Sequence, residues 1–174
     1  MRLRLVVLLA PVLLACGFRP VDASGVFGPD VRRIEIRPFD NPTAEPGFER
    51  LLGDSLVEEF ARRAVLEPLY GARTSDGTRA DLILQGEVTE LEIVPSAFSS
   101  VALTVEDTVI VHLDVEVLRS ATGRRIWGWR DLTLAERFAA SPDPQTYRSN
   151  KKQALLRLTA ELAARIHDGL FEAF

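Results

Sequence analysis

The sequence predicts an α+β fold, a two-layer sandwich in which a four-stranded mixed sheet carries two amphipathic helices on one face. Two observations lead to this prediction. Two stretches, one beginning near Thr43 and one at Asp143-Pro144, repeat apolar residues at the spacing of a helix with one buried side. Four other stretches alternate apolar and polar residues, which is typical of strands with one buried face. Along the chain these elements follow the order β-α-β-β-β-α.

The chain opens with a short apolar segment that predicts export and lipid attachment. Arg2 and Arg4 precede an apolar run over residues 5–14, which is too short for a membrane-spanning helix of roughly 20 residues. Cys16, the single cysteine, follows two leucines and an alanine. We predict that residues 1–15 are a lipoprotein signal peptide and that Cys16 is lipidated. The alternatives are an ordinary signal peptide followed by an unmodified cysteine, or a buried N-terminal helix.

A tether and a single domain are predicted to follow the signal. Residues 16–30 are rich in proline and glycine and show no sustained period, so we interpret them as the lipidated N-terminus and tether. Residues 31–174 have the length of a single α+β domain. Without Arg2 and Arg4 the 21 basic residues fall to 19 against 25 acidic ones, so the exported protein is acidic. This charge argues against a nucleic-acid partner.

The first part of the domain predicts a strand and then a helix. Apolar and charged residues alternate over residues 31–37, and Pro38 ends this strand. A helix is expected to begin near Thr43 or Ala44, because a threonine side chain can cap the first turn. Pro68 and the glycine three residues later end the helical unit. The apolar stripe of this helix consists of Phe48, Leu52, Leu56, Phe60 and Ala64.

The second strand begins near Asp81 and contains a change of parity. Leu84 and Val88 share one face, whereas Leu91 belongs to the other. A bulge between residues 88 and 91 would keep all of these side chains on the buried face. Because a helix joins the first two strands, we expect them to be parallel, with a right-handed crossover.

The third strand is the longest and predicts an elongated sheet. Its apolar residues occupy odd positions from 101 to 117, and a continuous strand of this length would extend roughly 55 Å. A long hairpin tipped by residues 94–101 should therefore reach past the main body. A turn at residues 121–123 leads to the fourth strand, in which Trp127 and Trp129 are interpreted as core or cross-strand packing.

Few residues offer the chemistry of a catalytic or metal site. His112 and His167 have no partners at metal-ligating spacing and are interpreted as surface residues. Asp107 is the one charge on the apolar parity of its strand. A bulge that turns it toward water, or a contact with a partner, would explain this position. We therefore predict that the protein is not an enzyme and has no cofactor.

The order and spacing of several segments resemble the lipopolysaccharide-assembly lipoprotein family, LptE. The matching segments are Cys16-Gly17-Phe18-Arg19-Pro20, residues 34–36 leading into 38–47, residues 80–88, residues 122–127 and the final amphipathic helix. The resemblance implies a lipoprotein of the outer membrane that faces the periplasm, with diacylglycerol and an N-acyl chain on Cys16. It implies that the protein plugs and helps to assemble a large β-barrel, LptD, and takes part in the delivery of lipopolysaccharide to the cell surface.

Some side chains are candidates for contact with lipopolysaccharide or the barrel. Phe98 lies at the predicted hairpin tip, which either projects freely or folds back onto the sheet. Cations that could meet phosphate groups are Arg124, Arg125, Lys151 and Lys152, with Arg130, Arg137 and Arg148 as further candidates. Such charges are also common on ordinary solvated surfaces.

A second function class shares several of these sequence features. Periplasmic adaptor lipoproteins of the curli-secretion and peptidoglycan-synthase-activator type also have a strand that enters a Pro-Phe turn followed by a helix. The immediate Cys-Gly-Phe-Arg start, the short tether and the three-strand meander favour the barrel plug.

Overall fold

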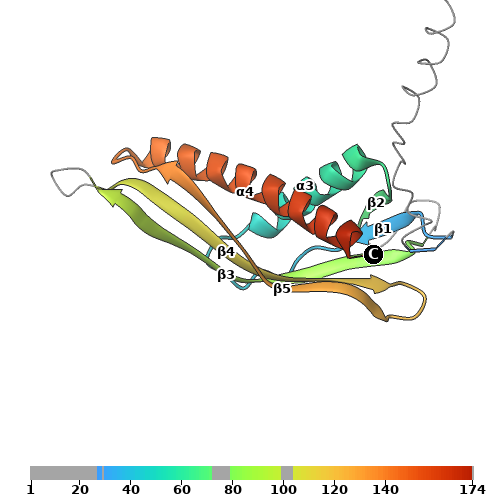
Figure 1. Ribbon diagram of the computed structural model, residues 1–174. Coiled ribbons are helices and arrows are strands. Elements are labelled where there is room, and N and C mark those ends of the chain that lie inside the picture. Colours follow the sequence, from blue (N-terminus) through green and yellow to red (C-terminus); the bar gives the residue numbers. More distant parts are fainter. Residues whose placement is uncertain (1–26, 29, 72–78, 99–103, 174) are drawn as a thin grey trace, which may run out of the picture.

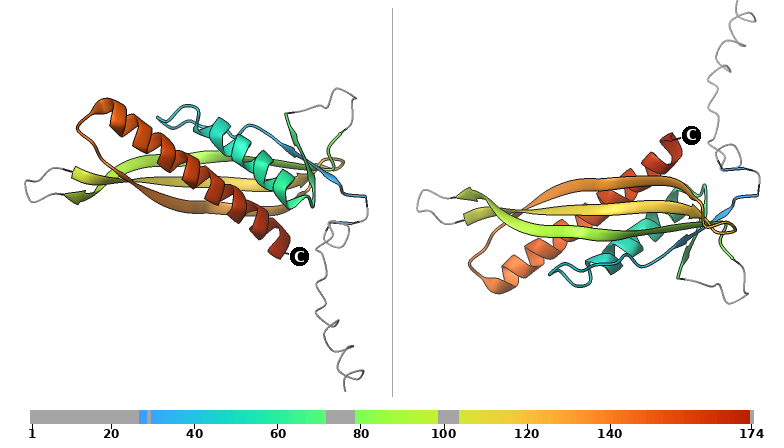
Figure 2. Two further views of the ribbon diagram at one scale, coloured as in Figure 1. Left: turned by 90° about the horizontal axis from the view of Figure 1, so that it is seen from above. Right: turned by 90° about the horizontal axis from the view of Figure 1, so that it is seen from below.

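The computed structural model describes residues 27, 28, 30–71, 79–98 and 104–173. They form one mixed sheet with two helices packed on one of its faces (Figures 1 and 2). The elements are β1 (Arg33–Ile36), α3 (Phe48–Arg63), β2 (Glu67–Tyr70), β3 (Leu82–Phe98), β4 (Thr104–Arg119), β5 (Arg125–Ala139) and α4 (Pro144–Glu172). The α+β class and the position of both helices on one face are confirmed.

The sheet has five strands in the order β2-β1-β3-β4-β5, so the prediction of four strands is wrong. The additional strand is β2, which pairs in parallel with β1 at the edge of the sheet. The backbone N–H groups of Glu67 and Gly71 donate to carbonyl groups of β1 and of the residue before it. Pro68 lies between them at a position that faces away from β1, where no donor is needed. A proline would interrupt a central strand, which pairs on both sides. It is tolerated in β2 because this edge strand pairs on one side only.

The helix α3 begins at Phe48, several residues later than predicted. The Asn41 side-chain oxygen accepts hydrogen bonds from the Thr43 N–H at 3.1 Å and from the Thr43 hydroxyl at 2.6 Å, which holds this segment in a turn. Gly47 then adopts a φ of 93° directly before the helix, a conformation that favours glycine. The Glu49 carboxylate accepts the Gly47 N–H at 3.0 Å. Thr43 thus stabilises the preceding loop and does not cap the helix.

The strands β3, β4 and β5 form the predicted elongated sheet. They pair as two long antiparallel hairpins, and the 17 residues of β3 extend roughly 55 Å (Figure 1). The pairing shifts between Val88 and Glu90, which confirms the predicted bulge. The first two predicted strands, β1 and β3, are parallel as expected. Residues 99–103, at the hairpin tip, lie outside the described part of the chain.

The core lies between the sheet and the two helices. Asp143 caps α4 by accepting the Thr146 N–H at 2.7 Å, as its sequence predicts, and the Ser55 hydroxyl of α3 bonds to that of Thr159 of α4 at 3.0 Å. Trp127 packs against this core, as expected, whereas Trp129 is 38% exposed. Large side chains that are fully buried include Phe48, Phe60, Ile34, Ile36, Leu52, Leu56, Leu84, Leu113 and Leu158.

Candidate functional site

The candidate contact residues lie at opposite ends of the elongated molecule. Arg124 and Arg125 are exposed at the β4–β5 turn, and within the described part of the chain neither forms an ion pair. Lys151 and Lys152 lie in the first half of α4, the helix whose N-terminus is at the other end of the sheet (Figure 1). The two pairs therefore do not form one site.

Two further predictions concern residues that the structure describes only in part or not at all. Cys16 lies outside the described residues. Phe98 ends β3 and pairs in register with Thr104, but its side chain is not among those described. The lipidation of Cys16 and the contact role of Phe98 both stay predictions.

The two lysines at the start of α4 differ in their surroundings. The Lys151 ammonium group lies 2.8 Å from a Glu45 carboxylate oxygen, and both side chains are partly buried. This ion pair joins α4 to the loop before α3. Lys152 is exposed, and Arg148 lies one turn before it on the same helix with an exposed side chain. Lys152 and Arg148 are therefore the better candidates for binding an anion.

Asp107 is buried at the same end of the molecule, so the prediction that a bulge turns it toward water is wrong. It is 8% exposed, and its carboxylate accepts a hydrogen bond from the Tyr147 hydroxyl of α4 at 2.8 Å. Burial and this hydrogen bond raise the pKa of Tyr147 to about 12, so the phenol remains a donor at neutral pH. The Tyr147 ring also meets Phe138 edge to face. These contacts attach the start of α4 to the long strands.

Figure 2 (right) shows the face of the sheet that carries no helices. The polar side chains of this face line a groove of about 890 Å³. On one side of it Arg37 contacts the Glu35 carboxylate and the Gln85 side-chain oxygen, each at 3.1 Å. Gln85 in turn donates to Glu116 at 3.0 Å across the β3–β4 pair. Charged and amide side chains are thus held in fixed positions by one another.

The other side of the groove is formed around a bulge in β5. Asp131 has a φ of 53°, and its N–H donates to Asp114 at 2.8 Å, while Arg130 contacts the second Asp114 oxygen at 3.2 Å. His112 lies 2.7 Å from the Asp131 carboxylate and lowers the pKa of that group. A groove of paired donors and acceptors suits contact with a polar surface. In the sequence, the bulge in β5 is indicated by the apolar residues, which change from odd positions at Trp129 to even positions at Leu132.

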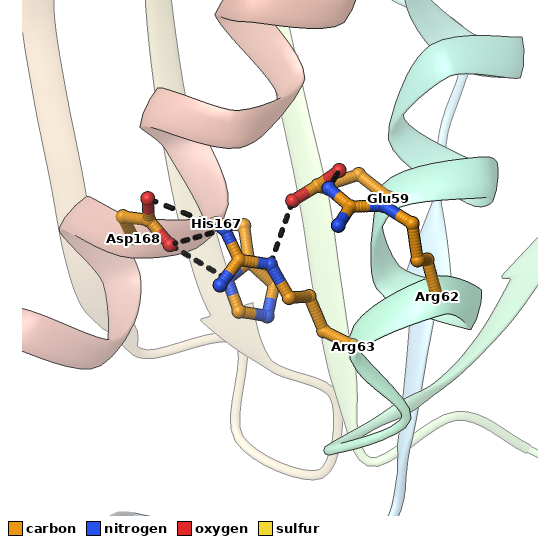
Figure 3. A network of polar contacts seen from close by, with 5 residues as sticks. All are labelled: Glu59, Arg62, Arg63, His167 and Asp168. Carbon is orange, nitrogen blue, oxygen red and sulfur yellow. Dashed lines mark hydrogen bonds and ion pairs between the residues drawn. The ribbon is translucent and has the colours of Figure 1, made fainter.

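His167 is buried between the helices, so its interpretation as a surface residue is wrong. It is 5% exposed, and its ring lies 5.0 Å from the Phe60 ring and 4.6 Å from the Phe171 ring. The Nδ1 atom is 3.3 Å from Asp168, whereas Nε2 has no hydrogen-bond partner in the described structure. Figure 3 shows the adjoining ion pairs, which run from Asp168 through Arg63 to Glu59 and Arg62.

Acidification is expected to destabilise the protein through His167. Burial lowers the pKa of His167 below its ordinary value of 6.5, against the opposing effect of Asp168. The unfolded chain therefore binds the proton first, and stability is lost as the pH falls below about 6.5. In a His167→Phe variant, urea midpoints should fall less between pH 7.5 and pH 5.5 than they do in the parent protein. An equal fall in both proteins would contradict this prediction.

The described residues contain neither a membrane-spanning helix nor a cluster of metal ligands. Neither α3 nor α4 is both long and apolar enough to cross a membrane. Within the same described ranges, no cluster of three or more His, Cys, Asp and Glu side chains is placed to hold a metal ion.

Solved structures of several bacterial proteins share this fold. A candidate lipoprotein from Caulobacter crescentus has a TM-score of 0.54 and 16% identity, over 78% of this chain and 89% of that one. The rare lipoprotein B from Shewanella oneidensis has a TM-score of 0.52 and 13% identity, over 79% of this chain and 95% of that one. Identities this low establish the fold alone. No protein with a curated function matches the sequence.

A family-level match is more informative than these structural neighbours. The sequence model of the LptE family, described as lipopolysaccharide-assembly, matches residues 31–170. This range begins two residues before β1 and ends two residues before the end of α4, so it includes all the described strands, the whole of α3 and nearly all of α4. The chain therefore belongs to the LptE family of lipopolysaccharide-assembly proteins.

Proposed function

We propose that this protein is an outer-membrane lipoprotein, anchored through Cys16, that plugs and helps to assemble an LptD-like β-barrel during lipopolysaccharide delivery. The observation that carries this proposal is the family match over residues 31–170. In this proposal residues 1–15 are removed as a signal peptide and residues 16–30 connect the lipid to the domain. The protein acts by binding its partners and not by catalysis.

The shape and surface of the domain support a role inside a barrel. The lumen of a large outer-membrane barrel is polar. The sheet face without helices carries paired charged groups such as Arg37–Glu35 and Arg130–Asp114. The helix face away from the core carries ion pairs such as Arg165–Glu161. A narrow, roughly 55 Å long body with polar surfaces on both sides suits such a lumen.

Affinity purification tests the proposed partner. We expect a tag after Phe174 to recover one very large β-barrel protein in equal amount after detergent extraction of outer membranes. A barrel with this subunit in its lumen should protect the tagged protein from added protease. Recovery of a ring of identical subunits, or of a peptidoglycan synthase, would support the adaptor class of lipoproteins and overturn the plug.

Charge reversal tests which cations meet lipopolysaccharide. Arg148 and Lys152 are exposed in the first half of α4 and form no ion pair with any described residue. Guanidinium and ammonium groups bind phosphate through charge-assisted hydrogen bonds. We expect R148E/K152E to weaken lipopolysaccharide binding by the purified protein more than tenfold, and R124E/R125E to change it much less. Unchanged binding in both double variants would contradict direct contact at either place.

A further inference from the structure

One end of the sheet gathers arginines that form no ion pair with any described carboxylate. The strands β1 and β3 begin there, β4 ends there and β5 begins there, as the pairs Ile34–Leu82, Leu82–Arg119 and Leu118–Arg125 show. We call four exposed residues at this end the arginine rim. None of their guanidinium groups forms an ion pair with a described residue. They are Arg32, Arg79, Arg124 and Arg125.

Among the described residues at this end of the sheet, the arginines outnumber the carboxylates. Asp81 accepts the backbone N–H groups of Arg32 and Arg33 at 2.9 and 3.0 Å, and Glu67 pairs with the Arg33 guanidinium at 3.0 Å. Asp30 and Glu172 add two exposed carboxylates nearby. The whole chain carries a net charge of −4, so the local charge at this end is opposite in sign to the net charge of the protein.

The N-terminal segment joins the domain at this same end. Phe27 is 6% exposed, and its ring meets that of Phe171, in the last turn of α4, at 5.5 Å. The Arg119 guanidinium at the end of β4 donates to the Phe27 carbonyl oxygen at 2.9 Å. These contacts fix the point at which the tether leaves the domain.

The length of the tether limits how the domain can face its membrane. Cys16 and Phe27 are eleven residues apart in the sequence, a span of at most about 40 Å. The sheet itself is roughly 55 Å long. If Cys16 carries the proposed lipid anchor, an upright domain cannot place the end of the sheet at Phe98 and Thr104 against the headgroups, because Phe27 would then lie beyond the reach of the tether. The end with the arginine rim is therefore the one that stays near the bilayer.

We propose that the arginine rim docks on the anionic phospholipid headgroups of the membrane that holds the anchor. This inference rests on the proposed lipidation of Cys16 and describes the lipoprotein before it enters a barrel. Each basic side chain near an anionic surface strengthens binding by about fivefold, and guanidinium groups bind phosphates in a bidentate manner. Docking by four arginines would keep the domain upright and hold the hairpin tip away from the bilayer.

Site-specific fluorescence quenching tests this docking. Lipidation consumes the only thiol, so a label can be placed on A121C, in the β4–β5 turn, or on S149C, near the start of α4; both positions are exposed. The purified lipoprotein is reconstituted in phosphatidylcholine vesicles, with or without phosphatidylglycerol, that contain headgroup-labelled quencher lipids. We expect phosphatidylglycerol to increase quenching at position 121 but not at position 149, and high salt to reverse the increase.

A matched pair of variants distinguishes binding by the arginine rim from an effect of the protein's net charge. R124E/R125E should abolish the increase caused by phosphatidylglycerol, whereas R148E/K152E, with the same change in net charge, should retain it. Two results would overturn the docking: an equal change of quenching in the two double variants, or an increase of quenching at position 121 with lipopolysaccharide vesicles but not with phosphatidylglycerol vesicles. Flotation with phosphatidylcholine vesicles reports the anchor by itself. A protein that floats without the increase disproves the docking only, whereas a protein that does not float disproves the anchor and the docking together.

Discussion

Replacement of Gly86 by valine is expected to prevent stable folding of the domain. Gly86 lies in β3, and a Cβ atom there would collide with the Asp114 carbonyl oxygen of β4 and lie 2.6 Å from the Phe39 ring. Neither group can move easily, because Asp114 belongs to a paired strand and Phe39 is 3% exposed. Overpacking of this kind costs about 3 kcal/mol or more, a large part of a typical total of 5–15 kcal/mol.

The segment after β1 explains why the space above Gly86 is filled. The Asp40 N–H donates to the Gly86 carbonyl at 3.0 Å, and the Val88 N–H donates to the Asp40 carbonyl at 2.8 Å, so this segment follows β3 in parallel. Phe39 is thereby held across the strand. A larger residue at position 86 would separate β3 from both neighbours at once.

Urea denaturation measures this effect, and Gly128 supplies the control. A Cβ atom at Gly128 in β5 would meet its nearest neighbours at 3.4 Å, which is ordinary contact. Gly128→Ala should therefore shift the free energy of unfolding by less than about 0.5 kcal/mol. Gly86→Ala already introduces the colliding atom and should behave like the valine variant. Equal stability of Gly86→Ala and Gly128→Ala would show that β3 can shift to make room.

Features encoded over short distances in the chain were predictable. The alternation along β4 predicted a long strand, and the parity change between Val88 and Leu91 predicted the bulge that the pairing with β4 confirms. Asp143-Pro144 predicted the first residues of α4. Each of these features is set by the preferences of neighbouring residues, so the sequence alone is informative about it.

Features that depend on distant partners were not predictable. Asp107 is satisfied by Tyr147, forty residues away in the sequence, and His167 is enclosed by Phe60 of the other helix. Spacing along the chain reveals neither contact, so a surface position was the natural expectation for both. The same reason explains why β2 was missed: a four-residue strand with Pro68 is identified only through its pairing with β1.

The candidate site was predictable only as a set of residue types. The arginines and lysines were identified as cations, but the sequence could not show that Lys151 pairs with Glu45 or that Arg124 lies at the opposite end of the molecule. The polar groove combines residues of β3, β4 and β5 with residues next to β1. The alternation along the strands predicts which of its side chains are polar. Which of them contact one another depends on the pairing register of the strands, which the sequence does not show.

Replacement of Cys16 by alanine is expected to remove the protein from the outer membrane. The proposed lipid is attached to the cysteine sulfur, for which alanine offers no substitute, and removal of residues 1–15 depends on that attachment. The variant should therefore incorporate no labelled palmitate and should retain the mass of the signal peptide. Sucrose-gradient fractionation should find it absent from the outer-membrane fraction, where the parent protein is expected.

Gly17→Ala provides the matched control for this experiment, because it changes the neighbouring residue and keeps the sulfur. It should incorporate palmitate, lose residues 1–15 and remain with the outer membrane. The structure adds a reason to expect a functional defect in Cys16→Ala even if the domain folds normally. Phe27 contacts Phe171 and Arg119 at one end of the sheet, so the proposed lipid tether would keep this end near the bilayer. Palmitate incorporation in Cys16→Ala would contradict lipidation at this residue and, with it, the orientation inferred from the length of the tether.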